Sequence, residues 1–72
     1  MNPAELLSVS INGETQQWPL GATIADVVAS LQLTGKRIAV ECNQEIVPRA
    51  EHGTTALRSG DQVEIVQAIG GG

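Results

Sequence analysis

The residues best suited to chemistry in this 72-residue chain are the last three, Gly70, Gly71 and Gly72. Glycines add no side chain to a core, and glycine loses more backbone freedom on ordering than any other residue. Three extended residues reach roughly 10 Å, which is enough to place a carboxylate inside another protein's active site. A glycine run alone would favour a cloning remnant or a frayed end, and the strand directly before it reverses that preference. We interpret the carboxylate of Gly72 as the functional group and Gly70 and Gly71 as the tail that enters a partner's site.

Two other reactive side chains, Cys42 and His52, each stand alone in the sequence. A single cysteine excludes an intrachain disulfide and a cysteine-pair metal site. Cys42 alternates with Ile38 and Val40, so we expect it to act as a small hydrophobic residue. His52 has no second histidine or cysteine near it in the sequence, and we predict a solvated loop residue. We therefore predict no catalytic residues, no metal site and no enzyme activity of the chain's own.

The charged residues show no spacing typical of a catalytic pair. We expect five of the acidic residues to lie on solvated faces; they are Glu41, Glu45, Glu51, Asp61 and Glu64. Arg49 and Arg58 are candidates for salt bridges at the rim of an interface, where charges set orientation more than affinity.

Composition limits the chain to one small domain, residues 1–72, with a tail at 70–72. A domain of this size buries only about 60% of its unfolded surface, which makes a large catalytic pocket difficult to enclose. The net charge of −4 opposes binding to nucleic acid or anionic lipid, and Trp18, the sole aromatic residue, provides no stacking platform. The sequence shows no secretory leader and no membrane-spanning run, so we expect a cytoplasmic protein.

The tail must be held by the elements before it, and alternation predicts the first two. Leu7, Val9 and Ile11 share one face of a strand. Asn12-Gly13 predicts a type I′ hairpin turn, because this turn needs positive φ at both central residues. A second strand follows over about residues 15–18.

A short helix is predicted next. Thr23 and Asp26 form a variant of the capping box. Behind them one apolar stripe is expected from Ile24, Val27, Val28 and Leu31. Gly35 is the expected stop.

The second half of the chain predicts three more strands. Apolar and polar residues alternate over 38–42, which predicts a strand. A turn is predicted at 43–44, followed by a short strand over 45–47 that Pro48 confines to a sheet edge. A polar stretch over 49–59, anchored by Leu57, leads through a tight turn at 59–61 to a last strand over 62–69. On that strand Val66 and Ala68 face away from the helix, and we favour them as a docking surface for a partner. The fold class is α+β, in the order β-β-α-β-β-β, with one helix packed on a mixed sheet.

Several segments in this order carry a resemblance to a known family: residues 12–14, 21–23, 37–43, 46–49, 60–61 and 64–66, followed by the glycine end. Together they resemble the ubiquitin-like β-grasp fold and, more narrowly, the ThiS family of sulfur carriers in thiamine thiazole synthesis. The resemblance covers nearly the whole chain. It implies a mixed sheet with the first and last strands parallel at its centre, and a flexible glycine-rich C-terminal tail. Gln44 and Trp18 depart slightly from the family pattern.

The same resemblance implies the chemistry and the partners. A ThiF-type adenylyltransferase would join the Gly72 carboxylate to AMP, using its own ATP and Mg²⁺, so this chain itself would bind no cofactor. A sulfur nucleophile would then give a thiocarboxylate, from which a ThiG-type thiazole synthase would take sulfur. Two alternatives stay open: the small subunit of molybdopterin synthase, and a passive ubiquitin-like binding module.

Overall fold

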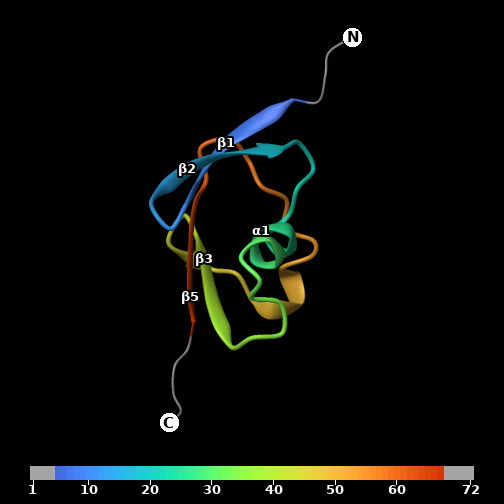
Figure 1. Cartoon of the computed structure of the whole chain (residues 1–72), viewed down its shortest axis with the longest axis vertical. Helices are drawn as coiled ribbons and strands as arrows, with labels where there is room; N and C mark the ends of the chain where they lie inside the picture. The colour runs from blue at the N-terminus through green and yellow to red at the C-terminus, as the bar shows by residue number, and fades with distance from the viewer. Residues whose placement is uncertain (1–4, 68–72) are drawn as a thin grey trace.

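The computed structural model describes residues 5–67, which form one mixed sheet with a single α-helix across it (Figure 1). The strands are β1 (Leu6–Ile11), β2 (Glu14–Pro19), β3 (Ile38–Cys42), β4 (Glu45–Ile46) and β5 (Gln62–Gln67). They lie in the order β2-β1-β5-β3-β4. β5 therefore occupies the centre, parallel to β1 and antiparallel to β3, and the predicted fold class is confirmed.

The first hairpin has the predicted alternation and turn. Leu7, Val9 and Ile11 are buried, whereas the residues between them point outward. Asn12 and Gly13 have φ of 51° and 87°, the positive values that a type I′ turn requires. β1 and β2 pair antiparallel along their whole length.

The helix α1 (Ile24–Ser30) begins where predicted and ends earlier than predicted. The Thr23 backbone N–H donates to the Asp26 carboxylate at 2.9 Å, and the Asp26 N–H donates to Thr23 Oγ1 at 3.4 Å, which completes the capping box. The predicted stop at Gly35 is wrong because Gln32 adopts the left-handed conformation, with φ of 61°. Leu31 is consequently a cap residue with 37% of its surface exposed, outside the buried stripe.

The early helix end is a Schellman motif built without glycine. The N–H groups of Leu33 and Gln32 donate to the carbonyl oxygens of Val28 and Ala29, at 3.0 and 2.9 Å. Leu33 packs against the core in consequence. Within residues 5–67, no helix is both long and apolar enough to cross a membrane.

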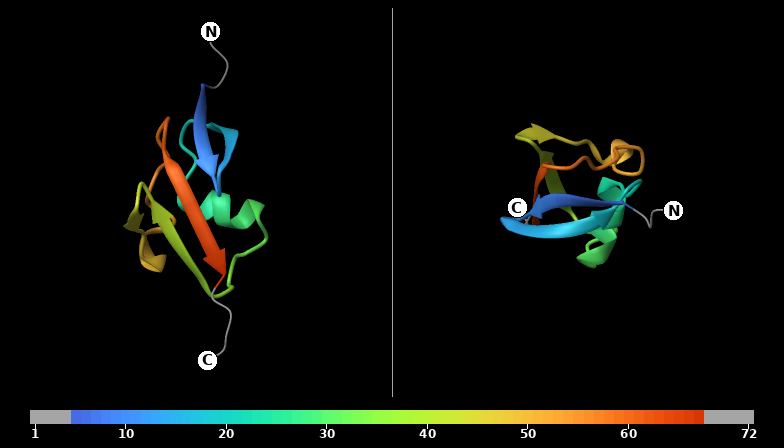
Figure 2. Two further views of the ribbon diagram at one scale, coloured as in Figure 1. Left: turned by 90° about the vertical axis from the view of Figure 1, so that its left-hand side faces the viewer. Right: turned by 90° about the horizontal axis from the view of Figure 1, so that it is seen from above.

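One face of the sheet and the helix enclose the core, as the two turned views show (Figure 2). The core consists of aliphatic side chains from every large element, namely Leu7, Val9, Ile11, Ala22, Ile24, Val27, Val28, Val40, Leu57, Val63 and Ile65. Leu57 anchors the polar stretch before β5, as predicted. The same stretch contains a 3₁₀ turn, η1 (Arg49–Glu51), which the sequence pattern did not predict. β4 lies at the sheet edge, as Pro48 indicated.

Candidate functional site

The predicted reactive end, Gly70, Gly71 and Gly72, lies outside the described residues, as does Ala68 of the predicted docking surface. The structure does describe the strand that leads to them. β5 runs through the centre of the sheet to Gln67, and this central position matches the prediction that the tail follows a well-anchored strand.

The first four residues of β5, residues 62–65, are held by two asparagine side chains in addition to their sheet partners. Asn12, in the β1–β2 turn, accepts a hydrogen bond from the Ile65 N–H at 2.8 Å. Asn43, in the β3–β4 turn, accepts one from the Gln62 N–H at 3.0 Å. Their own backbone N–H groups donate to the carbonyl oxygens of Val63 and Gln62. Turn residues of both neighbouring hairpins thus fix the position of β5.

Asp61 is buried at the start of β5, with 7% of its surface exposed, and the predicted solvated position is wrong for this residue. Its carboxylate accepts hydrogen bonds from Asn43 Nδ2 at 2.9 Å and from the Arg58 backbone N–H at 2.8 Å. Its carbonyl oxygen accepts from the Ser10 N–H at 2.9 Å. A buried carboxylate is tolerated because its oxygens are paired in this way.

The last two residues of β5, Val66 and Gln67, are exposed. β1 pairs with β5 at only two positions, Ser10 with Gln62 and Ile11 with Val63, whereas β3 pairs with it as far as Gln67. Val66 is 60% exposed on the face opposite the helix, as predicted, and Ala39 of β3 lies directly across from it.

Two carboxylates flank this exposed apolar pair. Glu64 and Glu41 lie directly opposite each other on the same face, an arrangement that like charges disfavour. Both are exposed, in agreement with the prediction. The outward surface near the end of β5 therefore combines a small apolar patch with negative charge.

Cys42 lies away from that surface, opposite Val63 at the start of β5. It is half-buried beside the core, as expected for a small hydrophobic residue. Burial, and next the negative charge of Asp61, raise the pKa of its thiol above the ordinary value. The thiol is therefore a weaker nucleophile at neutral pH than an exposed cysteine.

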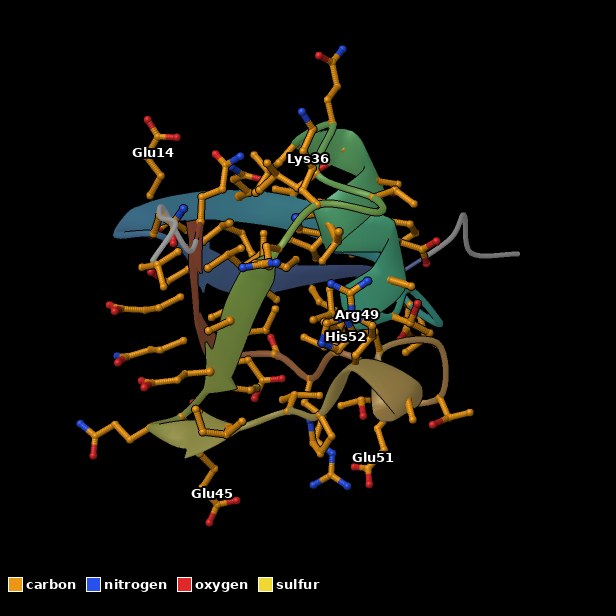
Figure 3. All side chains as sticks on the ribbon, turned by 90° about the horizontal axis from the view of Figure 1, so that it is seen from below. Glu14, Lys36, Glu45, Arg49, Glu51 and His52 are labelled. Carbon is orange, nitrogen blue, oxygen red and sulfur yellow. The ribbon has the colours of Figure 1, made fainter. Side chains whose placement is uncertain are left out.

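His52 and Arg49 have structural partners that the sequence did not reveal. His52 is half-buried, with Nε2 at 3.1 Å from the Val47 carbonyl oxygen, so its predicted solvated position is wrong. Arg49 Nη2 donates to the Lys36 carbonyl oxygen at 2.7 Å. Both side chains point toward the helix, whereas Glu45 and Glu51 point outward, away from the sheet and the helix (Figure 3). The predicted rim salt bridges of Arg49 and Arg58 remain a prediction.

Comparisons with known proteins place these features in a family context. The model of the ThiS family matches residues 4–72. The sulfur carrier protein ThiS of Bacillus subtilis is 37% identical over 65 residues, which cover 89% of this chain and 98% of that protein. A thiazole synthase of Paramagnetospirillum magneticum is 36% identical over 66 residues, and the chain spans only 20% of that protein's length.

A solved structure shows the same fold. The crystal structure of the thiamine biosynthesis protein ThiS from Geobacter metallireducens superposes with a TM-score of 0.76 and 23% sequence identity. The match covers 92% of this chain and 100% of that one. At this identity the likeness shows the shared β-grasp architecture.

Proposed function

Since the chain belongs to the ThiS family, we propose that it is a sulfur carrier of thiamine biosynthesis whose reactive group is the carboxylate of Gly72. The observation that carries the proposal is the extent of the family match, which includes the glycine run and reaches residue 72. The similarity to the Bacillus subtilis sulfur carrier over almost its whole length supports it. The chain is accordingly a co-substrate of other enzymes.

The chemistry starts from an ionised carboxylate, which is a poor electrophile because its unperturbed pKa is about 3.5. An adenylating partner of the ThiF type joins it to the AMP part of ATP, and pyrophosphate leaves. The ATP and Mg²⁺ belong to that partner. A persulfide on a partner protein attacks the acyl carbon, AMP leaves, and an acyl disulfide forms. A thiol reductant supplies two electrons to cleave the S–S bond, and the Gly72 thiocarboxylate is released.

The sulfur then passes to thiazole formation. Water supplies the oxygen that replaces the transferred sulfur, so the carboxylate returns for another cycle. These steps require Gly72 to be a free end, either as made or after trimming.

The folded body serves these steps by presenting the tail. The buried part of β5 holds the strand in place. Gly70 and Gly71 have no side chains that could obstruct entry into a partner's narrow site. Val66, together with Ala68, provides an apolar contact for docking, with an exposed fraction of 60% for Val66. In this proposal the partner recognises the outward face while the tail reaches its active site.

Thiazole synthase is the sulfur acceptor in this proposal. Two proteins named thiazole synthase, from Paramagnetospirillum magneticum and Magnetococcus marinus, each contain a segment similar to this chain. A carrier segment joined to a synthase in one polypeptide supports a working association between the two activities.

Intact-mass spectrometry tests the proposal directly. The chain, ending at Gly72, is incubated with the adenylyltransferase of the same organism, ATP, Mg²⁺, a persulfide donor and a thiol. We expect the mass change of one oxygen-to-sulfur exchange, located at Gly72 by fragmentation. The Bacillus subtilis sulfur carrier with its own adenylyltransferase is the positive control. Absence of the exchange while the control loads would refute the proposal in favour of a passive module.

A further inference from the structure

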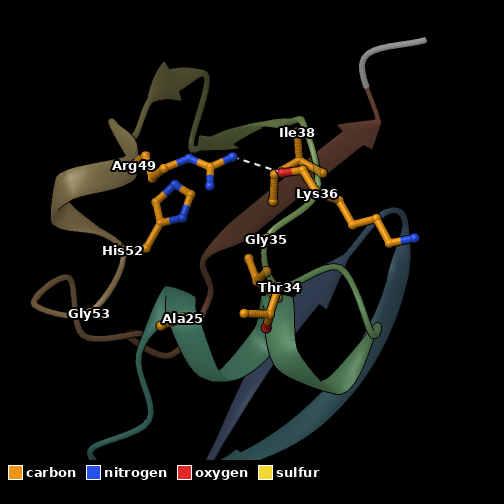
Figure 4. A pocket seen from close by; sticks show the side chains of 9 residues that line it. Ala25, Thr34, Gly35, Lys36, Ile38, Arg49, His52 and Gly53 are labelled. Atoms are coloured by element: carbon orange, nitrogen blue, oxygen red, sulfur yellow. Dashed lines mark hydrogen bonds between the residues drawn. The ribbon is translucent and has the colours of Figure 1, made fainter.

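A pocket of about 260 Å³ lies on the helix side of the sheet, between α1, the loop that follows it, the start of β3 and η1. Its floor is apolar and comes from Ala25, Val28 and Ile38. Figure 4 shows Arg49 and His52 on one side of the opening and Thr34 and the Lys36 backbone on the other, while the Lys36 ammonium points away from Arg49. The volume is below the roughly 300–1,000 Å³ of sites for drug-sized ligands, so it suits one or two side chains better than a nucleotide. We refer to it as the Arg49 pocket.

The charge of the Arg49 pocket is opposite to that of the chain. The chain has a net charge of −4 and only four lysines and arginines, yet Lys36 and Arg49 line this pocket together with the one histidine. None of its lining residues is acidic. The Arg49 guanidinium beside an apolar floor favours an occupant with an apolar group next to a carboxylate.

The guanidinium of Arg49 is already oriented for such an occupant. Its hydrogen bond from Nη2 to the Lys36 carbonyl oxygen, 2.7 Å long, holds the side chain across the opening. That bond uses one of five N–H groups, so others can bind a carboxylate. Because the side chain is fixed beforehand, less conformational entropy is lost on binding.

The pocket also lies at the end of the sheet from which the tail continues. Ile38, in the pocket floor, pairs directly with Gln67, the last described residue of β5. A protein that holds the tail therefore lies within reach of the Arg49 pocket as well as of Val66 on the opposite face.

We propose that the Arg49 pocket receives an apolar side chain and an adjacent Asp or Glu carboxylate from the thiazole synthase that takes the sulfur. This inference rests on the proposed sulfur-carrier function and adds a second docking point on the helix side of the sheet. The two contacts together hold the partner on both sides of the strand end, which fixes the direction in which the tail enters.

The affinity of the full chain for the thiazole synthase of the same organism, measured by isothermal titration calorimetry, tests this proposal. Arg49→Glu should weaken binding about tenfold, in the range that desolvated charge pairs contribute, and Lys36→Glu should weaken it by a similar factor because it places a carboxylate at the rim of the pocket, where it repels the partner's carboxylate. Lys36→Glu leaves the Arg49 bond intact, because that bond uses the Lys36 backbone carbonyl. It therefore carries the test if Arg49→Glu fails to fold.

Two further variants separate the pocket from general effects. Arg37→Glu makes the same charge change at an exposed residue that does not line the pocket and should weaken binding less than about threefold, as expected for a charge outside the contact. Ala25→Leu fills the floor without changing charge and should weaken binding at low and at high salt, whereas the effect of Lys36→Glu should shrink at high salt.

Several results would overturn the pocket proposal. It fails if folded Lys36→Glu and Arg49→Glu bind like the wild type, or if Arg37→Glu weakens binding as much as they do. A small branched acid, isovalerate, provides a further test. The proposal also fails if isovalerate binds the wild type and not Arg49→Glu while both proteins bind the synthase equally well, because the pocket would then be a small-acid site. Sulfur loading of the wild type at Gly72, measured in parallel, distinguishes these results from failure of the carrier function itself.

Discussion

The start and the end of β5 differ sharply although they belong to one six-residue strand. At its start, Val63 and Ile65 are buried, the preceding Asp61 is almost fully buried, and the asparagines of two hairpin turns bond to its backbone. At its end, Val66 is exposed and only β3 accompanies the strand to Gln67.

Stability and the proposed function are therefore expected to depend on different residues of the same strand. Residues 62–65 are fixed by burial and hydrogen bonds, so changes there should lower the free energy of unfolding. Val66 and Gln67 are exposed, so changes at these residues and in the glycine run should affect sulfur loading or docking.

Deletion of Gly72 should abolish sulfur loading, because the carboxylate would then end one residue short of the adenylating site. The free energy of unfolding should barely change, since a glycine has no side chain to bury. Intact-mass spectrometry measures the loading, and thermal unfolding measures the stability. A large fall in the melting temperature would show that the end of the chain is structural, which contradicts the separation of stability from sulfur loading.

Asp61→Ala should have the largest effect on stability. It leaves Asn43 Nδ2 and the Arg58 N–H without their acceptor, and hydrogen bonds to a charged group contribute roughly 1.5–3 kcal/mol. In a domain of this size, each kcal/mol lowers the melting temperature by about 4–8 °C. The part of the variant that remains folded should still load sulfur at Gly72. Loss of loading in molecules shown to be folded by circular dichroism would contradict the separation.

Val66→Ala should weaken binding to the thiazole synthase about tenfold, because roughly two buried methylene equivalents are lost at the interface. Its effect on unfolding should stay within about 0.5 kcal/mol, as for most surface substitutions. Ile46→Ala is the matched control, since Ile46 is 64% exposed on the edge strand β4. Equal loss of affinity in both variants would show that the outward end of β5 is not a specific docking surface.

Asn12→Gly and Asn12→Ala together isolate one of the asparagine contacts. Asn12→Gly keeps the positive φ of 51° at low cost and removes the hydrogen bond from Ile65, so we expect a loss of about 1 kcal/mol. Asn12→Ala removes the same bond and adds left-handed strain of about 1–2 kcal/mol. Urea unfolding measures both. Equal stability of Asn12→Gly and the wild type would show that the side-chain bond does not hold β5.

The sequence predicted the elements whose signals are local. Alternation in β1 and β3, the Asn12-Gly13 turn and the Thr23–Asp26 capping box all involve residues within a few positions of one another, and each is confirmed. The helix end was missed because Gln32 occupies the left-handed position that glycine usually takes.

The contacts that position β5 were not predictable in the same way, because their partners are distant in the sequence. Asn12 bonds to a residue 53 positions away, and Asn43 reaches Asp61 across 18. The type of residue at position 61 indicates a solvated carboxylate, and only the folded arrangement shows the donors that allow its burial. The Arg49 pocket depends likewise on a bond across 13 residues, from Arg49 to Lys36.

Cys42→Ser should have the smallest effect, and it tests whether the thiol of β3 that lies beside the buried part of β5 takes part in chemistry at all. Cys42 lies opposite Val63, and Ile38 lies opposite Gln67, so the thiol is about 13 Å along the sheet from the last described residue of β5. Burial and the nearby Asp61 raise its pKa, so the thiolate fraction at neutral pH is lower than that of an exposed cysteine. Sulfur loading of Cys42→Ser should therefore match the wild type, and alkylation of wild-type Cys42 should be slower in the folded protein than after unfolding in urea. Loss of loading in a folded Cys42→Ser variant would place sulfur chemistry at Cys42 of β3, beside the buried part of β5.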